Sequence, residues 1–261
     1  MKLTIYQVDA FTDEVFKGNP AAVCPLNEWL EDELLLKIAA ENNLSETAFY
    51  VPVADGYEIR WFTPNVEVDL CGHATLATAF VLFTQEGFKG DTIRFNSPRS
   101  GLLTVRIENG QFLLNFPKDE FQAIELSEQL INTSDKTPIA AFKGKTDYML
   151  IFETEEEISS MKPALANIAA LNARGLIVTA KGNDTDFVSR FFGPAVGVNE
   201  DPVCGSAHTT LMPYWAEKLN ANKLKASQLS ARTGKLSCEL KGNRVELGGK
   251  AVLYLKGEIY L

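Results

Sequence analysis

An internal echo constrains the fold of this chain more than any other feature of its sequence. The segments RWFTPNVEVDLCGHAT (residues 60–75) and RFFGPAVGVNEDPVCGSAHT (residues 190–209) both read Arg, aromatic, Phe, any residue, Pro, a loop and then Cys-Gly-x-Ala. The arginines are 130 residues apart and the cysteines 133, in a chain of 261 residues. A repeat at half the chain length predicts two similar lobes related by pseudo-symmetry. The alternative is a chance match between two short segments.

Each lobe is expected to be rich in strands. Apolar residues alternate with polar ones in KLTIYQV, YEIRWF, GLLTVRI, QFLLNF, DYMLIF, GLIVTA and KAVLYL, the period of a half-buried strand. The pairs Asn109-Gly110, Gly242-Asn243 and Gly248-Gly249 tolerate positive φ and predict hairpins, so neighbouring strands should run antiparallel. This pattern argues against a parallel Rossmann sheet.

Four helices are expected among these strands. One should begin at Asn27 as its N-cap and run through residues 27–43, and a second should follow Cys71. A third is expected over residues 156–171, with Pro163 near its first turns, and a fourth after Cys204. Strands and helices together predict an α+β fold.

Composition narrows the functional classes. A chain of 261 residues with 46% hydrophobic content can bury a large core. Its net charge of −9 disfavours nucleic acid or an anionic membrane as a partner, because both attract a positive face. Neither a signal peptide nor an apolar run of about 20 residues is visible, so we expect a cytoplasmic protein.

No motif predicts a cofactor. The four cysteines show no CxxC spacing and are expected to be thiols, and the sequence has no GxGxxG, no GxxxxGK and no clustered metal ligands. We therefore expect chemistry that needs neither a cofactor nor a metal ion.

The two Cys-Gly helix starts are the best candidates for a binding site. The first turn of a helix offers unpaired N–H groups and a positive dipole end, which bind carboxylates and other anions. Gly72 and Gly205 allow close backbone approach, while His73, Asp201 and Ser206 add donors, acceptors and a titratable carboxylate. This combination predicts proton transfer on a small anionic substrate.

The chain resembles the PhzF-like phenazine biosynthesis family, within the diaminopimelate epimerase-like fold. The resemblance spans nearly the whole chain and rests on VDAFTDEVFKGNPAAV, LSETAFYV, IRWFTPNVEVDLCGHATLATA, EDPVCGSAH and SQLSARTG. It implies two lobes, each a strand barrel around a central helix, with the active site in the cleft between them, and a homodimer. The lobes are expected at residues 1–117, completed by the last C-terminal strands, and at residues 118–261.

The resemblance also implies roles for particular residues. In the family, a glutamate at the position of Glu46 is the general acid/base that moves a proton along a conjugated substrate, which is dihydro-hydroxyanthranilate in the phenazine enzyme. His73, Asp201 and Ser206 match the positions that orient the substrate and relay or hold the proton. A base that takes and returns a proton works best with a pKa near neutrality, so Glu46 is expected to be partly desolvated.

Two other functions stay open. The sequence also resembles the racemase branch of the fold, in which two cysteines at the helix starts act on opposite faces of an α-carbon, and Cys71 and Cys204 occupy those places. A helix N-terminus lowers the pKa of a thiol, which makes such a pair chemically feasible. The third interpretation is a protein that binds a small acid without catalysis.

Several of these residues also have plain structural interpretations. Cys24 and Cys238 are expected to be small apolar core residues. His208 lies one turn into its helix, and the sequence favours neither a place in the site nor a place in the core for it. Asp201 is also interpreted as an N-cap ahead of a proline. Three further residues have the character of turn residues, and their functional interpretation is a contact with the carboxylate of the substrate: Asn19, Arg232 and Gly234.

Overall fold

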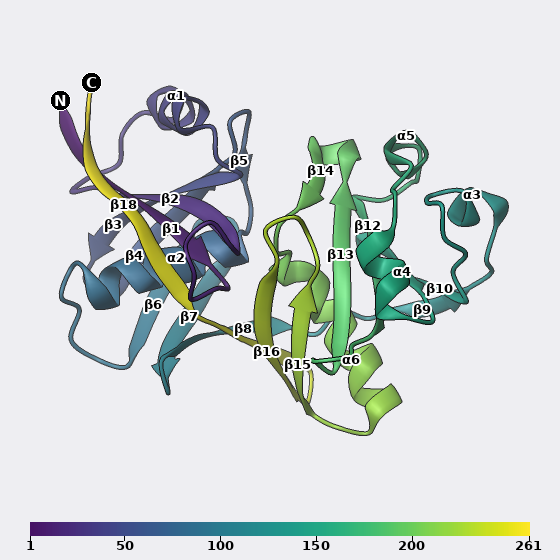
Figure 1. The fold of residues 1–261 in the computed structure, drawn as a ribbon. Coiled ribbons are helices and arrows are strands. Elements are labelled where there is room, and N and C mark those ends of the chain that lie inside the picture. The colour runs from purple at the N-terminus through teal and green to yellow at the C-terminus, as the bar shows by residue number, and fades with distance from the viewer. The chain divides into compact units, whose positions relative to one another are not determined.

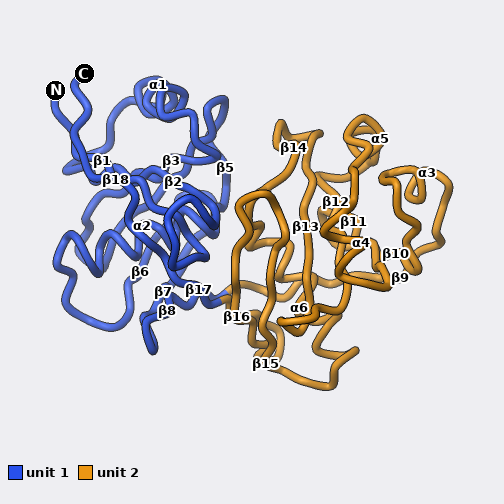
Figure 2. The backbone as a smooth tube through the Cα atoms, viewed as in Figure 1, with its two compact units in different colours: residues 1–115, 248–261 blue, residues 116–247 orange.

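The chain forms two compact units in the computed structural model, which describes residues 1–261 (Figure 2). Unit 1 comprises residues 1–115 and 248–261, and unit 2 comprises residues 116–247. Both boundaries fall inside strands, β8 (Gln111–Pro117) and β17 (Arg244–Gly249). The C-terminal segment after β17 therefore belongs to unit 1 together with the N-terminus.

The strands of unit 1 form a mixed sheet with both parallel and antiparallel neighbours (Figure 1). Its strands are β18 (Ala251–Tyr260), β1 (Lys2–Ala10), β2 (Asn19–Pro25), β3 (Glu46–Val53), β4 (Gly56–Phe62), β6 (Thr92–Ser97) and β7 (Gly101–Glu108). Taken in this order, successive pairs are antiparallel, antiparallel, parallel, antiparallel, parallel and antiparallel. The short β5 (Glu67–Val68) pairs with the end of β4, and β8 pairs with β7.

Unit 2 repeats this succession strand for strand. Its strands are β9 (Gln122–Ile124), β10 (Ala140–Lys143), β11 (Asp147–Ile151), β12 (Gly175–Lys181), β13 (Phe187–Gly193), β15 (Lys223–Gln228) and β16 (Gly234–Lys241), with β14 (Val198–Asp201) against the end of β13. The pairs have the same order of directions as in unit 1. The expected α+β fold with two pseudo-symmetric lobes is confirmed.

Each unit contains one long helix that begins directly after an echoed cysteine. In unit 1, α2 (Gly72–Thr84) packs against β1, β2, β3 and β18, and apolar or small residues cover almost its whole surface. A helix that is apolar all round belongs inside a fold, and α2 occupies this central place. In unit 2, α6 (Gly205–Leu219) packs against β15 and β16. None of the helices combines the length and apolarity that a bilayer-crossing segment needs.

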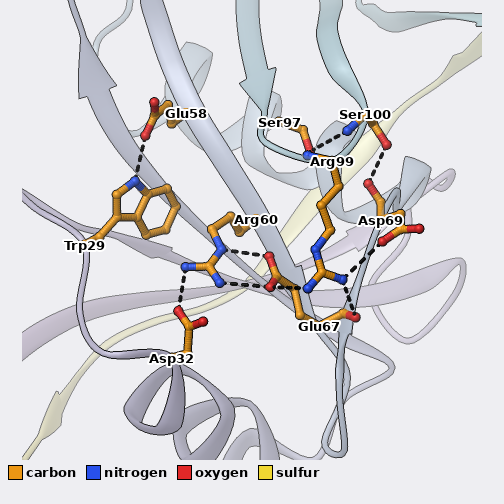
Figure 3. Close-up of polar contacts among 9 residues, drawn as sticks. All are labelled: Trp29, Asp32, Glu58, Arg60, Glu67, Asp69, Ser97, Arg99 and Ser100. Carbon is orange, nitrogen blue, oxygen red and sulfur yellow. Dashed lines mark hydrogen bonds and ion pairs between the residues drawn. The ribbon is translucent and has the colours of Figure 1, made fainter.

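The echoed Arg-aromatic-Phe motif forms the same ion-pair lock in both units. In unit 1, Arg60 donates from Nε to Glu67 at 2.7 Å and from Nη2 at 2.8 Å, and its guanidinium lies 5.1 Å from the Phe62 ring centre (Figure 3). In unit 2, Arg190 donates to Glu200 at 2.7 and 3.0 Å and lies 4.9 Å from the Phe192 ring. Each ion pair joins the strand that carries the motif, β4 or β13, to the short strand before the long helix, β5 or β14.

Two of the expected helices have different bounds. The first, α1, spans Asp32–Asn42 with Glu31 as its N-cap residue, so Asn27 does not cap it. The chain is still paired with β3 at this point, because the N–H of Leu26 donates to the carbonyl of Tyr50. The helix therefore begins only after the chain has left the sheet.

The prediction of a single helix over residues 156–171 is wrong. The structure has two short helices there, α4 (Glu155–Ser160) and α5 (Leu165–Ala169), with an extended Met161 at ψ 135° after the first. Pro163 lacks the N–H that a continuous helix needs and disfavours helical geometry in the residue before it. The remaining short helices are α3 (Glu128–Ile131) and the 3-10 turn η1 (Pro194–Val196).

One of the predicted hairpins is confirmed and another is wrong. Asn109 and Gly110 both have positive φ and join β7 to β8 as expected. Gly248 and Gly249 do not form a hairpin, because both lie inside β17 and the strand that follows pairs with β1. Gly249 is needed for packing instead: a Cβ there would lie 2.4 Å from Cδ1 of Phe11.

Candidate functional site

Glu46 opens β3 on the face of the sheet that meets the central helix of unit 1. It lies opposite Ala21 in the parallel pairing of β2 and β3, and its side chain is 17% exposed. The buried Asn19 begins β2 two residues before Ala21, so it lies on the same face as Glu46. The position between helix α1 and strand β3 thus holds a carboxylate that is mostly, but not entirely, removed from water.

His73 brings the second titratable group to this place from the first turn of α2. Its Nε2 lies 3.2 Å from Oε2 of Glu46, and its side chain is 7% exposed. Burial lowers the pKa of His73 to about 3, so the imidazole is neutral at neutral pH. The contact joins a carboxyl group to a neutral ring.

Cys71, the N-cap residue of α2, completes the group. Its Sγ lies 3.5 Å from Nδ1 of His73. The two contacts bring a carboxyl group, an imidazole and a thiol together within unit 1.

The same three side chains form a candidate metal-ligand cluster. One ligand atom each from Glu46, Cys71 and His73 lies within 4.8 Å of the other two. The sequence shows no such cluster, because the glutamate is 25 residues from the cysteine and the motif spacing resembles no familiar metal site. Only the pairing of β2 with β3 around α2 brings them together.

Unit 2 has different chemistry at the equivalent helix start. Ser206, in the first turn of α6, accepts a hydrogen bond at 2.9 Å from Nη2 of Arg174, and its Oγ lies 3.3 Å from Sγ of Cys204. Arg174 is held by Asp147, whose side chain is 5% exposed, through Nε at 2.9 Å and through Nη2. Nη1 of Arg174 makes no hydrogen bond within the chain.

Register places Gly175 of unit 2 at the position that Glu46 has in unit 1. Thr47 pairs with Phe62 as Leu176 pairs with Phe192, and these phenylalanines belong to the echoed motif. No side chain fits at Gly175, because a Cβ would lie 2.4 Å from Cζ of Phe191 and 2.7 Å from a backbone carbonyl. The carboxyl group at this place is therefore a property of unit 1 alone.

Arg174 was missed by sequence reasoning. It precedes β12 and lies 32 residues before Ser206, outside both echoed segments. The register that makes Gly175 equivalent to Glu46 also makes Arg174 the counterpart of Ser45. Only an alignment of the two strands that precede the motifs could have identified Arg174 from the sequence. Loops of unequal length make that alignment hard to recognise.

Burial dominates the chemistry of the second echoed cysteine. The pKa of Cys204 is raised to about 12, first by removal from water and then by the charge of Asp201, with opposing contributions from Arg174 and Ser206. The expectation that a helix N-terminus would supply a thiolate is wrong for Cys204. Cys24 and Cys238 are buried among apolar residues, and burial raises both of their thiol pKa values, in agreement with the expected core roles.

Two other candidates, Asp201 and His208, lie near Cys204 in unit 2. Asp201 ends β14 and accepts from the N–H of Val203, while Cys204 is the N-cap residue of α6, so the helix-cap interpretation of Asp201 is wrong. His208 is fully buried, and its Nδ1 lies 2.8 Å from the carbonyl of Cys204. It is a core histidine.

Arg232 and Gly234 lie together in unit 2. Arg232 is half-buried in the turn that ends at Thr233, where the N–H of Thr233 donates to the carbonyl of Ser230. Gly234 begins β16 opposite Gln228. Gln228 donates to the carbonyl of Asp201 and accepts from the N–H of Cys204, so this turn is tied to the start of α6.

Comparison with known proteins gives one consistent picture. The model of a family described as phenazine biosynthesis-like protein, PhzC-PhzF, matches residues 8–257. An uncharacterised isomerase of Pseudomonas aeruginosa is 49% identical, and one of Halalkalibacterium halodurans is 44% identical, each over the full length of both chains. A crystal structure of a PhzF-family phenazine biosynthesis protein from Enterococcus faecalis covers both chains fully with 47% identity and a TM-score of 0.97.

Proposed function

Because this chain belongs to the PhzF-like phenazine biosynthesis family, whose bacterial relatives include proteins named isomerases, we propose that it is an isomerase that moves a proton on a small carboxylate-bearing substrate. Glu46 is the general acid/base in this proposal. The observation that carries it is the contact of 3.2 Å between the carboxyl group of Glu46 and the buried His73.

The surroundings of Glu46 suit a group that both accepts and returns a proton. A general base must lose part of its hydration and keep access to the substrate, and Glu46 is 17% exposed. The neutral His73, whose Nε2 lies 3.2 Å from Oε2 of Glu46, adds no positive charge beside the carboxyl group. After Glu46 takes a proton from a carbon atom of the substrate, the carboxyl proton exchanges with solvent and Glu46 delivers a proton to another carbon, which conserves atoms and charge.

Unit 2 contributes to substrate binding in this proposal. The guanidinium of Arg174 is oriented by Asp147 and is 35% exposed, with Nη1 directed to no protein acceptor. Arginine recognises carboxylates through paired N–H groups, and the first turn of α6 adds backbone donors beside Ser206. We propose that Arg174 and Ser206 bind the carboxylate of the substrate.

The two-cysteine racemase is the weaker candidate. In each direction it needs one cysteine as the thiolate base and the other as the thiol acid, so each must ionise in turn, and burial raises the pKa of Cys204 to about 12. The asymmetry between Glu46 and Gly175 also favours one acid/base group in unit 1 over a matched pair.

The experiment is incubation in deuterated water, followed by mass spectrometry, with dihydro-hydroxyanthranilate, proline, hydroxyproline and diaminopimelate as probes. The proposal expects carbon-bound deuterium in a substrate with the wild-type protein and Cys204→Ser, and none with Glu46→Gln. Label that survives Glu46→Gln and disappears in Cys204→Ser would establish the racemase instead. A probe that binds without acquiring label in any variant would support the binding protein.

A further inference from the structure

We propose that a second copy of this chain binds along the outer edge of β18, so that the unit-1 sheets of the two copies join in an antiparallel pair. The twofold axis of this pair passes through Gly257, which lies within β18. The inference concerns assembly and does not depend on the reaction that Glu46 performs.

β18 is an edge strand of unit 1. It pairs with β1 (Lys2–Ala10) and with no other strand, so its second edge presents unpaired backbone N–H and C=O groups (Figure 1). Edge strands that stay free in solution are usually short, interrupted by proline or covered by a loop. This strand has ten residues, no proline and one irregularity of register, opposite Gln7 and Val8. A long edge of this kind is a template for a further strand.

Exposed apolar side chains gather beside this edge. Tyr254 and Leu255 of β18 and Val15 and Phe16 of the loop between β1 and β2 are all at least 40% exposed. The ring of Phe16 lies edge-on to that of Tyr254, with 5.6 Å between the ring centres. Exposed apolar side chains that adjoin one another indicate a surface that binds a partner.

The sequence of β18 around Gly257 is complementary to itself. Residues 255–259 read apolar, positive, glycine, negative, apolar. In an antiparallel pair of two copies centred on Gly257, Lys256 lies opposite Glu258 of the partner subunit, and Leu255 lies opposite the partner's Ile259. Opposite charges that face each other across an antiparallel pair stabilise it, whereas like charges destabilise it.

Charge favours a second copy over an unrelated strand. A lysine in the middle of an exposed edge discourages pairing unless the partner strand supplies an acid. Lys256 forms no ion pair within its own chain, and its Nζ lies 5.2 Å from the ring centre of Tyr6. Glu258 contacts Lys2 at 2.6 Å but is 45% exposed, which leaves its carboxylate accessible to a second cation.

The same charges select the register. An axis at Lys256 would place two lysines opposite each other, and an axis at Glu258 would place two glutamates opposite each other. Of these three registers, only the one centred on Gly257 puts each charge opposite its counterpart.

Gly257 also makes the register testable by cross-linking. A Cβ at this position would meet no atom of its own chain closer than 3.6 Å, so a cysteine fits there. In the proposed pair, the two Cα atoms at position 257 lie about 4.5–5.5 Å apart, which is within the range that a disulfide spans.

The first test is the mass of the protein in solution, measured by sedimentation velocity over a range of concentrations. We expect the wild-type protein at twice the chain mass. Lys256→Glu places like charges opposite each other twice in the symmetric pair, and should raise the dissociation constant of the dimer at least about tenfold. Adding Glu258→Lys to that variant restores the complementarity and should restore the dimer. Lys89→Glu, at an exposed lysine outside β18, should leave the mass unchanged.

The second test is oxidation of introduced cysteines, followed by electrophoresis without reductant. The four native cysteines are all buried, so their contribution to cross-linking should be small. Gly257→Cys should give a covalent dimer. Thr92→Cys, at an exposed position of β6, should remain a single chain under the same conditions.

Three results would overturn the inference. The first is wild-type protein that sediments as a monomer at every concentration. The second is a dimer that Lys256→Glu leaves intact while its circular dichroism stays that of the wild type. The third is a dimer in which Gly257→Cys cross-links no more than Thr92→Cys. None of these readouts needs a substrate, so failure here leaves the proposed isomerase untouched, and failure of the isomerase leaves the dimer untouched.

Discussion

Removal of the charge of Glu67 should destabilise unit 1 through its ion-pair lock (Figure 3). The Glu67 side chain is 11% exposed and accepts from Arg60 at 2.7 and 2.8 Å and from Arg99 at 2.9 Å. Loss of one partner of a buried pair costs about 3–5 kcal/mol. Arg60 keeps its contact of 2.9 Å with Asp32, so we expect Glu67→Gln to lower the free energy of unfolding by about 2–3 kcal/mol.

The assay is urea unfolding followed by circular dichroism, with the midpoint compared at unchanged m-value. Asp32→Asn is the control, because Asp32 is 75% exposed and such surface pairs contribute at most about 1 kcal/mol. Glu200→Gln in unit 2 should cost about 1–2 kcal/mol, less than Glu67→Gln, since Arg190 also donates to the carbonyls of Ile158 and Met161. A loss with Glu67→Gln no larger than that with Asp32→Asn would refute the reasoning.

Four further predictions follow from local geometry. Gly249→Ala should cost about 1–3 kcal/mol in urea unfolding because its Cβ would lie 2.4 Å from Phe11, whereas Gly257→Ala, whose nearest neighbour is 3.6 Å away, should be tolerated; equal costs would contradict the packing argument. Burial lowers the pKa of His73 to about 3 and that of His208 to about 4, so between pH 6.5 and 4 the unfolded chain binds protons that the folded chain does not. Stability should therefore fall as pH falls through this window, by up to about 1.4 kcal/mol per pH unit for each histidine, and imidazole NMR signals that titrate near pH 6.5 in the folded protein would disprove it. Cys24, Cys204 and Cys238 should resist iodoacetamide in the native protein at pH 7.5, read by peptide mass spectrometry, and rapid labelling of Cys204 would restore the two-cysteine mechanism. Arg174→Met should raise KM for a carboxylate substrate at least about tenfold with a smaller change in kcat, and an unchanged KM would remove Arg174 from substrate binding.

The echoed segments made much of the fold predictable. Because Arg60 and Arg190, and Cys71 and Cys204, recur at half the chain length, the sequence predicts two lobes with a helix after each cysteine. In the structure, the strands of the two units follow the same order, and α2 and α6 each begin directly after one of the two cysteines. The period-two stretches likewise predict the strands, since one face of each is buried.

The errors in the fold have local causes. Residues 156–171 contain helix-forming residues on both sides of Pro163, and residue preferences alone do not show where the chain breaks. Asn27 is a good cap by type, but the pairing of Leu26 with Tyr50 keeps the chain in the sheet beyond it. Tertiary contacts decided both positions, and those contacts are invisible in a short window of sequence.

The candidate site was predictable only in part. His73 lies inside an echoed motif, whereas Glu46 was singled out through the family resemblance and not by any local signal. Arg174 and its support from Asp147 depend on the parallel register of β11 and β12, which sequence spacing does not reveal. The metal-ligand cluster was missed for the same reason, because pairing of distant strands creates it.

The central claim is that Glu46 moves the proton. Glu46→Gln keeps the size and a hydrogen-bond acceptor facing His73 but cannot carry the proton, while Glu41→Gln changes an exposed glutamate of α1 in the same way. With a substrate found in deuterated water, the first-order rate of label incorporation should fall by about 10²–10⁴-fold in Glu46→Gln and stay within about twofold in Glu41→Gln. Equal rates in Glu46→Gln and the wild type would contradict the account.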